Sequence, residues 1–194
     1  LLLLANRLDD LAPQLASLLE QDKANIAGSL MHLNRMLGRH SDKKAVQRLI
    51  DRVATPYGNL PEAHFAMGLA AANADDLMHA QGEFQKALQL RPDWESAELA
   101  YAQLLARTSP ASAIESLNEF LARKPDARDA RLTLARLLIS ERKYDAARAQ
   151  FDILLKDSPD NPDVVYPVAM LALQQGDAAG ARSQLEKLLK SDFP

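Results

Sequence analysis

A pattern of small and large residues returns along this chain every 33 or 34 residues. Small residues lie at Gly68, Ala102, Ala135 and Ala169, and a second set lies at Ala80, Ala113, Ala147 and Ala181. Each member of the second set is followed four residues later by a large apolar residue, namely Phe84, Leu117, Phe151 and Leu185. A period of about 20 to 50 residues is typical of chains that stack copies of one supersecondary unit. The sequence therefore predicts a repeat architecture.

Proline and capping residues mark the ends of the units. Pro92, Pro125 and Pro159 each close a unit, because proline lacks an amide hydrogen and disfavours helical geometry in the residue before it. Phe193 takes the equivalent place in the last unit. Short polar side chains that can cap a helix stand at the expected helix starts: Ser41, Ser109, Asn161 and Asp177. We expect each unit to be a helix, a short turn and a second helix.

This period, with Gly68, Ala80, Phe84, Ala87 and Pro92 in the best-matching unit, resembles the tetratricopeptide repeat family over roughly residues 26 to 194. The resemblance implies an all-α fold, a right-handed superhelical solenoid of antiparallel helix pairs with about five and a half repeats. The predicted repeats cover residues 26–60, 61–94, 95–127, 128–161 and 162–194, after a partial repeat at 1–25. We interpret them as one domain, a fragment of a longer bacterial adaptor protein.

The spacing also predicts which residues are structural. One amphipathic helix pair cannot bury its apolar face alone, so neighbouring pairs stack and build a continuous core. We expect Gly68, Ala102 and Ala135 where helices cross closely, with Phe84 and Phe151 filling the adjacent space. Pro167 lies inside a predicted helix, where it either kinks or restarts the helix or is tolerated as a proline of the first turn.

Composition excludes several classes of protein. The chain is 47% hydrophobic and 25% charged with a net charge of -3, a balance typical of folded proteins and without the clustered basic residues of a nucleic-acid binder. No stretch reaches the ~18 apolar residues of a membrane span, so we expect no direct membrane insertion by this segment.

The chain has no cysteine, which excludes disulfides, thiolate catalysis and cysteine-based zinc sites. A chain without cysteine is compatible with an oxidising compartment. Its Ala-, Leu- and Gln-rich composition is similar to that of bacterial envelope repeat proteins. This similarity favours the cell envelope or periplasm over the cytoplasm.

No residue pattern predicts catalysis or a cofactor. His32, His40, His64 and His79 have no partners at metal-binding spacing, so we interpret them as surface or half-buried helix residues. The sequence also has no glycine-rich phosphate loop and no nucleophile elbow. We predict that the chain is not an enzyme and binds no metal.

The resemblance to the family instead places a ligand groove on the first helix of every repeat. The projecting positions carried over from the family are Leu30, Phe65, Leu99, Leu132 and Tyr166, followed one turn later by Asn34, Leu69, Gln103, Arg136 and Met170, and then by Arg107. Apolar anchors beside arginines suit a protein or peptide with hydrophobic side chains and a nearby carboxylate. The alternative is that part of this set is core between repeats, because a helical stripe alone does not separate the two.

Two functions are consistent with these observations. The first is an interaction scaffold or adaptor that binds a protein or peptide in the groove. The alternative is a structural spacer or oligomerisation arm of a larger protein, which would form homo-oligomers through its ends, because solenoid ends normally need polar caps.

Overall fold

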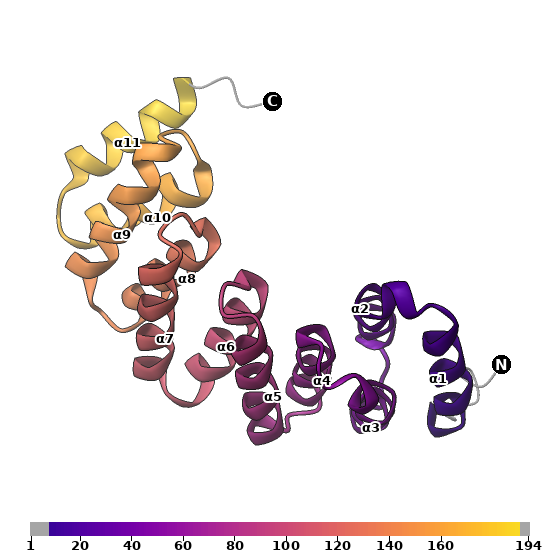
Figure 1. Ribbon diagram of the computed structural model, residues 1–194. Helices are drawn as coiled ribbons and strands as arrows, with labels where there is room; N and C mark the ends of the chain where they lie inside the picture. The colour runs from indigo at the N-terminus through magenta and orange to yellow at the C-terminus, as the bar shows by residue number, and fades with distance from the viewer. Residues whose placement is uncertain (1–7, 191–194) are drawn as a thin grey trace. The chain divides into compact units, whose positions relative to one another are not determined.

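The computed structural model describes residues 8–190, which form eleven α-helices, three short 3-10 helices and no strand (Figure 1). The predicted all-α fold is therefore confirmed. The helices divide into two compact units, of which the first ends at Thr108 and the second begins at Ser109. This boundary lies inside the repeat predicted at residues 95–127.

The described part of unit 1 contains six α-helices and three short 3-10 helices. Its elements are η1 (Leu8–Leu11), α1 (Ala12–Gln21), η2 (Lys23–Asn25), α2 (Ile26–Leu37), α3 (Lys43–Ala54), η3 (Thr55–Tyr57), α4 (Pro61–Asn73), α5 (Leu77–Leu90) and α6 (Glu95–Thr108). Helix α4 lies at the centre, since it packs against α2, α3, α5 and α6.

Unit 2 consists of consecutive helices joined by short turns. They are α7 (Pro110–Arg123), α8 (Arg128–Ser140), α9 (Tyr144–Asp157), α10 (Pro162–Gln174) and α11 (Ala178–Lys190). Helix α8 packs against α9, and α10 packs against both α9 and α11. Helices α4, α8 and α10 begin at Pro61, Arg128 and Pro162, the first residues of the corresponding predicted repeats.

The turns inside three of the repeats share one backbone geometry. Their central residues, Asp75, Arg142 and Gly176, have positive φ angles of 64°, 57° and 83°. The amide of the next residue donates to a carbonyl five residues earlier, as Asp76 N does to Ala71 O (2.9 Å). Glycine adopts this conformation without strain, whereas aspartate and arginine adopt it at a cost. The common turn thus has a clear sequence signal only at Gly176.

Three of the four predicted capping side chains accept a hydrogen bond from a backbone amide in the first turn of their helix. Asn161 Oδ1 accepts from Asp163 N (2.9 Å), Asp177 Oδ1 from Gly180 N (2.8 Å) and Ser109 Oγ from Ser112 N (3.4 Å). The prediction for Ser41 is wrong. Asp42 caps α3 by accepting from Ala45 N (2.9 Å), because it directly precedes the first helical residue.

The repeated small and large residues form the core, as predicted. Phe84, Leu117 and Phe151 are completely buried, and the alanines of both sets are at most 1% exposed. Gly68 has a specific role, since a Cβ at this position would lie 2.6 Å from the Phe84 ring. The glycine therefore leaves the space that the Phe84 ring fills.

Two further expectations concern unit 2. Helix α10 continues without a break from Pro162 to Gln174, so Pro167 neither ends nor restarts it. Phe193 lies outside the described residues. No helix of the described part of the chain is long and apolar enough to cross a membrane.

Candidate partner-binding faces

Three of the predicted groove residues are buried in unit 1. Leu30, Asn34 and Phe65 are 0%, 4% and 6% exposed. Asn34 Nδ2 donates to Ala66 O (2.8 Å) and so joins α2 to α4. The Phe65 ring packs against the rings of Phe84 and Trp94, with centroids 5.8 and 4.6 Å apart. These three side chains form core between helices, so only the exposed members of the set present a surface to a ligand.

The remaining predicted residues of unit 1 lie on α4 and α6. Leu69 and Leu99 are partly buried, whereas Gln103 and Arg107 are exposed. The Arg107 guanidinium donates to Asp75 Oδ1 (2.6 Å), a residue of the turn after α4. A ligand carboxylate would have to compete with Asp75 for this arginine.

Unit 2 presents three exposed apolar side chains on a single helix. Tyr166 and Met170 on α10 are 57% and 62% exposed. Leu173, one turn further along the same side, is 47% exposed and was not among the predicted groove residues. Spacings of four and three residues place all three side chains on one side of the helix. Their periodicity could have identified Leu173.

Helix α8 places an arginine beside this apolar stripe. Arg136 is exposed and lies 4.0 Å from Asp163 Oδ1 on α10, while Leu132 on α8 is partly buried. This separation is longer than that of a normal charge-assisted hydrogen bond. Arg136 is thus better placed than Arg107 to receive an external carboxylate. We call Tyr166, Met170, Leu173 and Arg136 the α10 face.

Unit 1 also contains a groove that includes none of the predicted residues. It has a volume of about 910 Å³ and lies between α1 and α2. Its apolar walls include Leu15 and Leu18 on α1 and Leu33 and Met36 on α2. Leu18 and Met36 are both 58% exposed.

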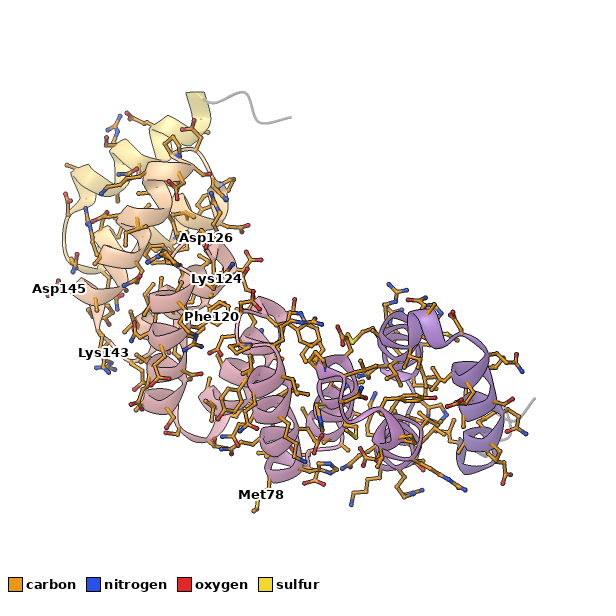
Figure 2. All side chains as sticks on the ribbon, in the orientation of Figure 1. Met78, Phe120, Lys124, Asp126, Lys143 and Asp145 are labelled. Carbon is orange, nitrogen blue, oxygen red and sulfur yellow. The ribbon has the colours of Figure 1, made fainter. Side chains whose placement is uncertain are left out.

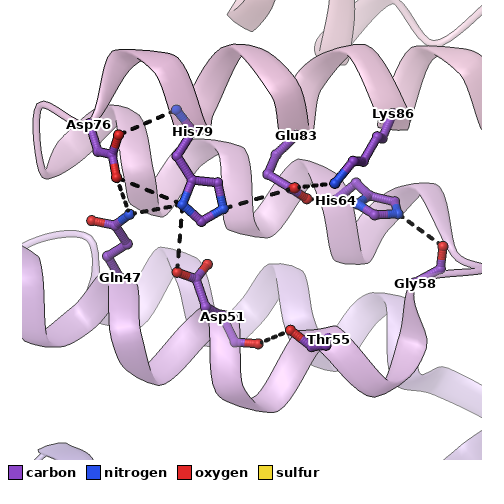
Figure 3. A network of polar contacts seen from close by, with 9 residues as sticks. All are labelled: Gln47, Asp51, Thr55, Gly58, His64, Asp76, His79, Glu83 and Lys86. Atoms are coloured by element: carbon purple, nitrogen blue, oxygen red, sulfur yellow. Dashed lines mark hydrogen bonds and ion pairs between the residues drawn. The ribbon is translucent and has the colours of Figure 1, made fainter.

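A polar network joins helices α3, α4 and α5 of unit 1 (Figure 3). Glu83 is only 7% exposed and lies 2.7 Å from His64 Nδ1, and Lys86 Nζ donates to its second oxygen (2.8 Å). Burial alone would raise the pKa of Glu83. Hydrogen bonds from His64 and Lys86, together with their charges, outweigh burial and lower the pKa below its ordinary value of 4.5.

Asp51, in the same network, is shifted in the opposite direction. Burial raises its pKa above the ordinary value of 3.8, and the neighbouring carboxylates of Glu83 and Asp76 add to the rise, against an opposing effect of His79. Asp51 Oδ1 is buried without a hydrogen-bond partner. Within residues 8–190, no group of three or more histidine, aspartate or glutamate side chains is arranged to hold a metal ion.

Comparison with known proteins agrees with this arrangement of helices. The family model described as tetratricopeptide repeat matches residues 104–164 and again residues 140–194. Residues 104–194 of this chain are therefore tetratricopeptide repeats. The match begins near the end of α6 and includes all of unit 2.

Among curated proteins, this chain is similar to cellulose synthase operon protein C of Escherichia coli K12. The two are 27% identical over an alignment that covers 92% of this chain. The same alignment covers only 16% of the relative, so the chain spans less than a fifth of that protein.

Solved structures share the fold at low sequence identity. MamA of Desulfovibrio magneticus RS-1, from residue 41 to its end, matches with a TM-score of 0.66 and 19% identity, covering 86% of this chain and 97% of that one. YrrB, described as a tetratricopeptide repeat protein with an unusual peptide-binding site, matches with a TM-score of 0.61 and 17% identity, covering 94% and 95% of the two chains.

Proposed function

We propose that this chain is a non-catalytic scaffold that binds a protein or peptide partner through the α10 face. The main support for this proposal is the exposure of Tyr166, Met170 and Leu173 on one side of a single helix. Exposed apolar patches bordered by polar residues are typical of protein interaction sites. Aromatic, methionine and arginine side chains are also enriched at such interfaces.

The chemistry of the face supports a partner of a particular kind. Tyr166 and Met170 would contact apolar side chains of the partner, and Arg136 would pair with a carboxylate next to them. The names of the curated relatives connect them to a cellulose synthase operon. We therefore propose proteins encoded in such an operon as the first partners to test, and the cell envelope as the compartment.

The experiment is a pull-down of partners by the full chain and its Tyr166→Asp/Met170→Asp variant. The control is Met78→Asp, because Met78 is 88% exposed and projects from α5 in unit 1 (Figure 2). We expect the partner to be recovered by the parent chain and the control, and at least about tenfold less by the α10 variant, since hot-spot truncations cost ~2 kcal/mol or more. Circular dichroism checks that all three chains are folded. Equal recovery by all three would contradict the proposal.

A second candidate function, self-association as a structural arm, is favoured by the groove between α1 and α2. Helix α1 packs against α3, which is the second helix of the repeat predicted at residues 26–60. Helices α1 and α2 make few contacts with each other, and no other helix of the described residues covers the apolar walls of the groove between them. A helix from a second copy of the chain would fill this place.

Sedimentation velocity over a range of concentrations tests this candidate. A dimer that is lost in Met36→Asp and retained in Met78→Asp would support it, because both residues are exposed methionines but only Met36 lines the groove. A monomer at all concentrations would contradict it and leave the α10 face as the functional surface.

A further inference from the structure

Two repeats contain an equivalent pair of contacts, made in each case by one side chain of the first helix. His64 on α4 contacts the carbonyl of Gly58, six residues earlier, and the side chain of Glu83, nineteen residues later. Arg131 on α8 contacts the carbonyl of Pro125 and the side chain of Gln150 at the same two separations. Each contact pair ties a first helix to the loop before it and to the second helix of its repeat. We call each pair a clasp.

The clasp of unit 2 is held by a permanent cation. Arg131 donates to Gln150 Oε1 (2.8 Å) and to Pro125 O (2.6 Å), and its side chain is 9% exposed. A guanidinium keeps all its N–H donors throughout the physiological pH range. Both hydrogen bonds of this clasp are therefore independent of pH.

The clasp of unit 1 uses a side chain that can lose its charge. His64 Nδ1 lies 2.7 Å from Glu83 Oε2, and Nε2 lies 2.9 Å from Gly58 O. A carbonyl and an ionised carboxylate can only accept hydrogen bonds, so both contacts form only when both ring nitrogens carry a proton. In neutral imidazole one ring nitrogen would face an acceptor with a lone pair. The side chains of His64 and Glu83 are 12% and 7% exposed, which limits replacement by water.

We propose that His64 makes the α4–α5 helix pair a pH-sensitive clasp, held by two hydrogen bonds in the imidazolium form and by only one in the neutral form, while Arg131 keeps both hydrogen bonds of the equivalent clasp of unit 2 throughout the physiological pH range. The two clasps share their geometry and differ in whether the donor titrates. Unit 2 therefore serves as an internal control for unit 1.

Other ionisable groups face this clasp from α5 and α3. Lys86 on α5 donates to Glu83 Oε1 and helps to keep that carboxylate ionised. His79 Nε2 lies 3.9 Å from Glu83 Oε1, and Asp51 on α3 lies 3.9 Å from His79 Nδ1 (Figure 3). Protonation of His79 adds a second positive charge near Glu83. The titration of His64 must therefore be observed at His64 itself.

The direction of the pH dependence follows from which protonation state of His64 has hydrogen-bond partners for both ring nitrogens. Imidazolium has both acceptors only in the folded state, so the stability of the clasp is present at low pH and is lost as His64 deprotonates. Histidine is the side chain that changes charge between about pH 5 and 8. On the acid side the clasp fails when Glu83 is protonated, and the lowered pKa of Glu83 places that limit below pH 4.5.

The test combines nitrogen-15 NMR of the histidine rings with amide hydrogen exchange of the full chain from pH 5 to 8, corrected for intrinsic exchange. We expect both His64 nitrogens to be protonated at pH 5. Deprotonation should weaken protection of the α4 and α5 amides about tenfold, the size of one hydrogen bond to a charged group. The amides of α8 and α9 should keep their protection. A singly protonated His64 ring at pH 5, or unchanged protection on deprotonation, would overturn the proposal.

A second test uses a variant that introduces into unit 1 the amide found in the clasp of unit 2. Glu83→Gln replaces the carboxylate by the amide found at Gln150, and this amide can donate to an unprotonated ring nitrogen. We expect the loss of protection at high pH to disappear in Glu83→Gln and to persist in the control His32→Gln, whose ring is exposed on α2. A loss of equal size in Glu83→Gln and the parent chain would also overturn the proposal.

Discussion

At the scale of single residues, one network holds two carboxyl groups with opposite shifts of their pKa. Glu83 has donors on both oxygens, whereas Asp51 has a buried oxygen without a partner. The difference arises because hydrogen bonds to an ionised carboxylate stabilise its charge, and burial without them does not. Glu83 therefore contributes stability that is lost as the pH falls through its lowered pKa.

Asp51→Asn is expected to stabilise the fold at neutral pH. A raised pKa means that the folded state disfavours the charged form, so the contribution of Asp51 is most favourable below pH 3.8 and is lost as the pH rises through its folded pKa. Removing this charge should raise the free energy of unfolding by about 1 kcal/mol at pH 7, within the range for a buried unpaired polar group. Urea unfolding at pH 7 and pH 3.5 measures it. A gain of equal size at both pH values would contradict the explanation.

Gly68→Ala is expected to destabilise unit 1 although alanine favours helices. The new Cβ would lie 2.6 Å from the buried Phe84 ring, and overpacking of this kind costs about 1–3 kcal/mol. Gly82→Ala is the matched control, because a Cβ at Gly82 meets no atom within 4 Å. It should gain up to ~1 kcal/mol from helix propensity. Thermal unfolding of both variants compares them, and the same sign for both would argue against the packing role of Gly68.

At the scale of helices, the repeats combine a common turn with unequal local sequences. Asp75, Arg142 and Gly176 occupy equivalent left-handed positions, and only one of them is a glycine. The hydrogen bonds of the turn and the packing of the helix pair hold the other two in place. Pro167 is a similar case, since α10 continues through a residue that cannot donate its backbone hydrogen bond.

Pro167→Ala is expected to stabilise α10. Proline inside a helix costs about 3 kcal/mol relative to alanine, and the more flexible unfolded chain offsets about 1 kcal/mol of the gain. We expect a net increase of about 2 kcal/mol in the free energy of unfolding of unit 2. Pro162→Ala should change it little, because Pro162 is the first residue of α10 and needs no intrahelical donor. Chemical denaturation followed by circular dichroism distinguishes the two positions, and equal effects would contradict this reasoning.

At the scale of the whole molecule, the chain is a series of helix pairs in two compact units. Stacked repeats contact only their neighbours, so stability is close to a sum of local terms. This organisation allows one unit to respond to pH or to a ligand while the other keeps its structure.

Phe151→Ala is expected to destabilise unit 2 more than unit 1. The Phe151 side chain is completely buried, and truncation of a buried phenylalanine costs about 3–5 kcal/mol. Amide exchange should accelerate in α8 to α11 and remain within about threefold of the parent chain in α2 to α5. Phe84→Ala should give the reverse pattern. Loss of protection across both units in either variant would show that the chain unfolds as one cooperative body.

The repeat period by itself determined the fold class, the core residues and most helix starts. This was possible because small residues at fixed spacing are required wherever helices cross closely, as at Gly68 and Ala135. Asp42 shows the limit of local reasoning, since two adjacent polar residues could cap α3 and only the backbone selects one of them.

Only the tertiary structure decided which members of the predicted groove are exposed. Leu30, Asn34 and Phe65 have the same helical spacing as Tyr166 and Met170, yet neighbouring helices cover the first three and leave the last two accessible. A periodic stripe specifies one side of a helix, and the position of the next helix determines whether that side is core or surface. The clasp of His64 was likewise invisible in the sequence, because its partners are six and nineteen residues away and meet only after α4 and α5 have packed.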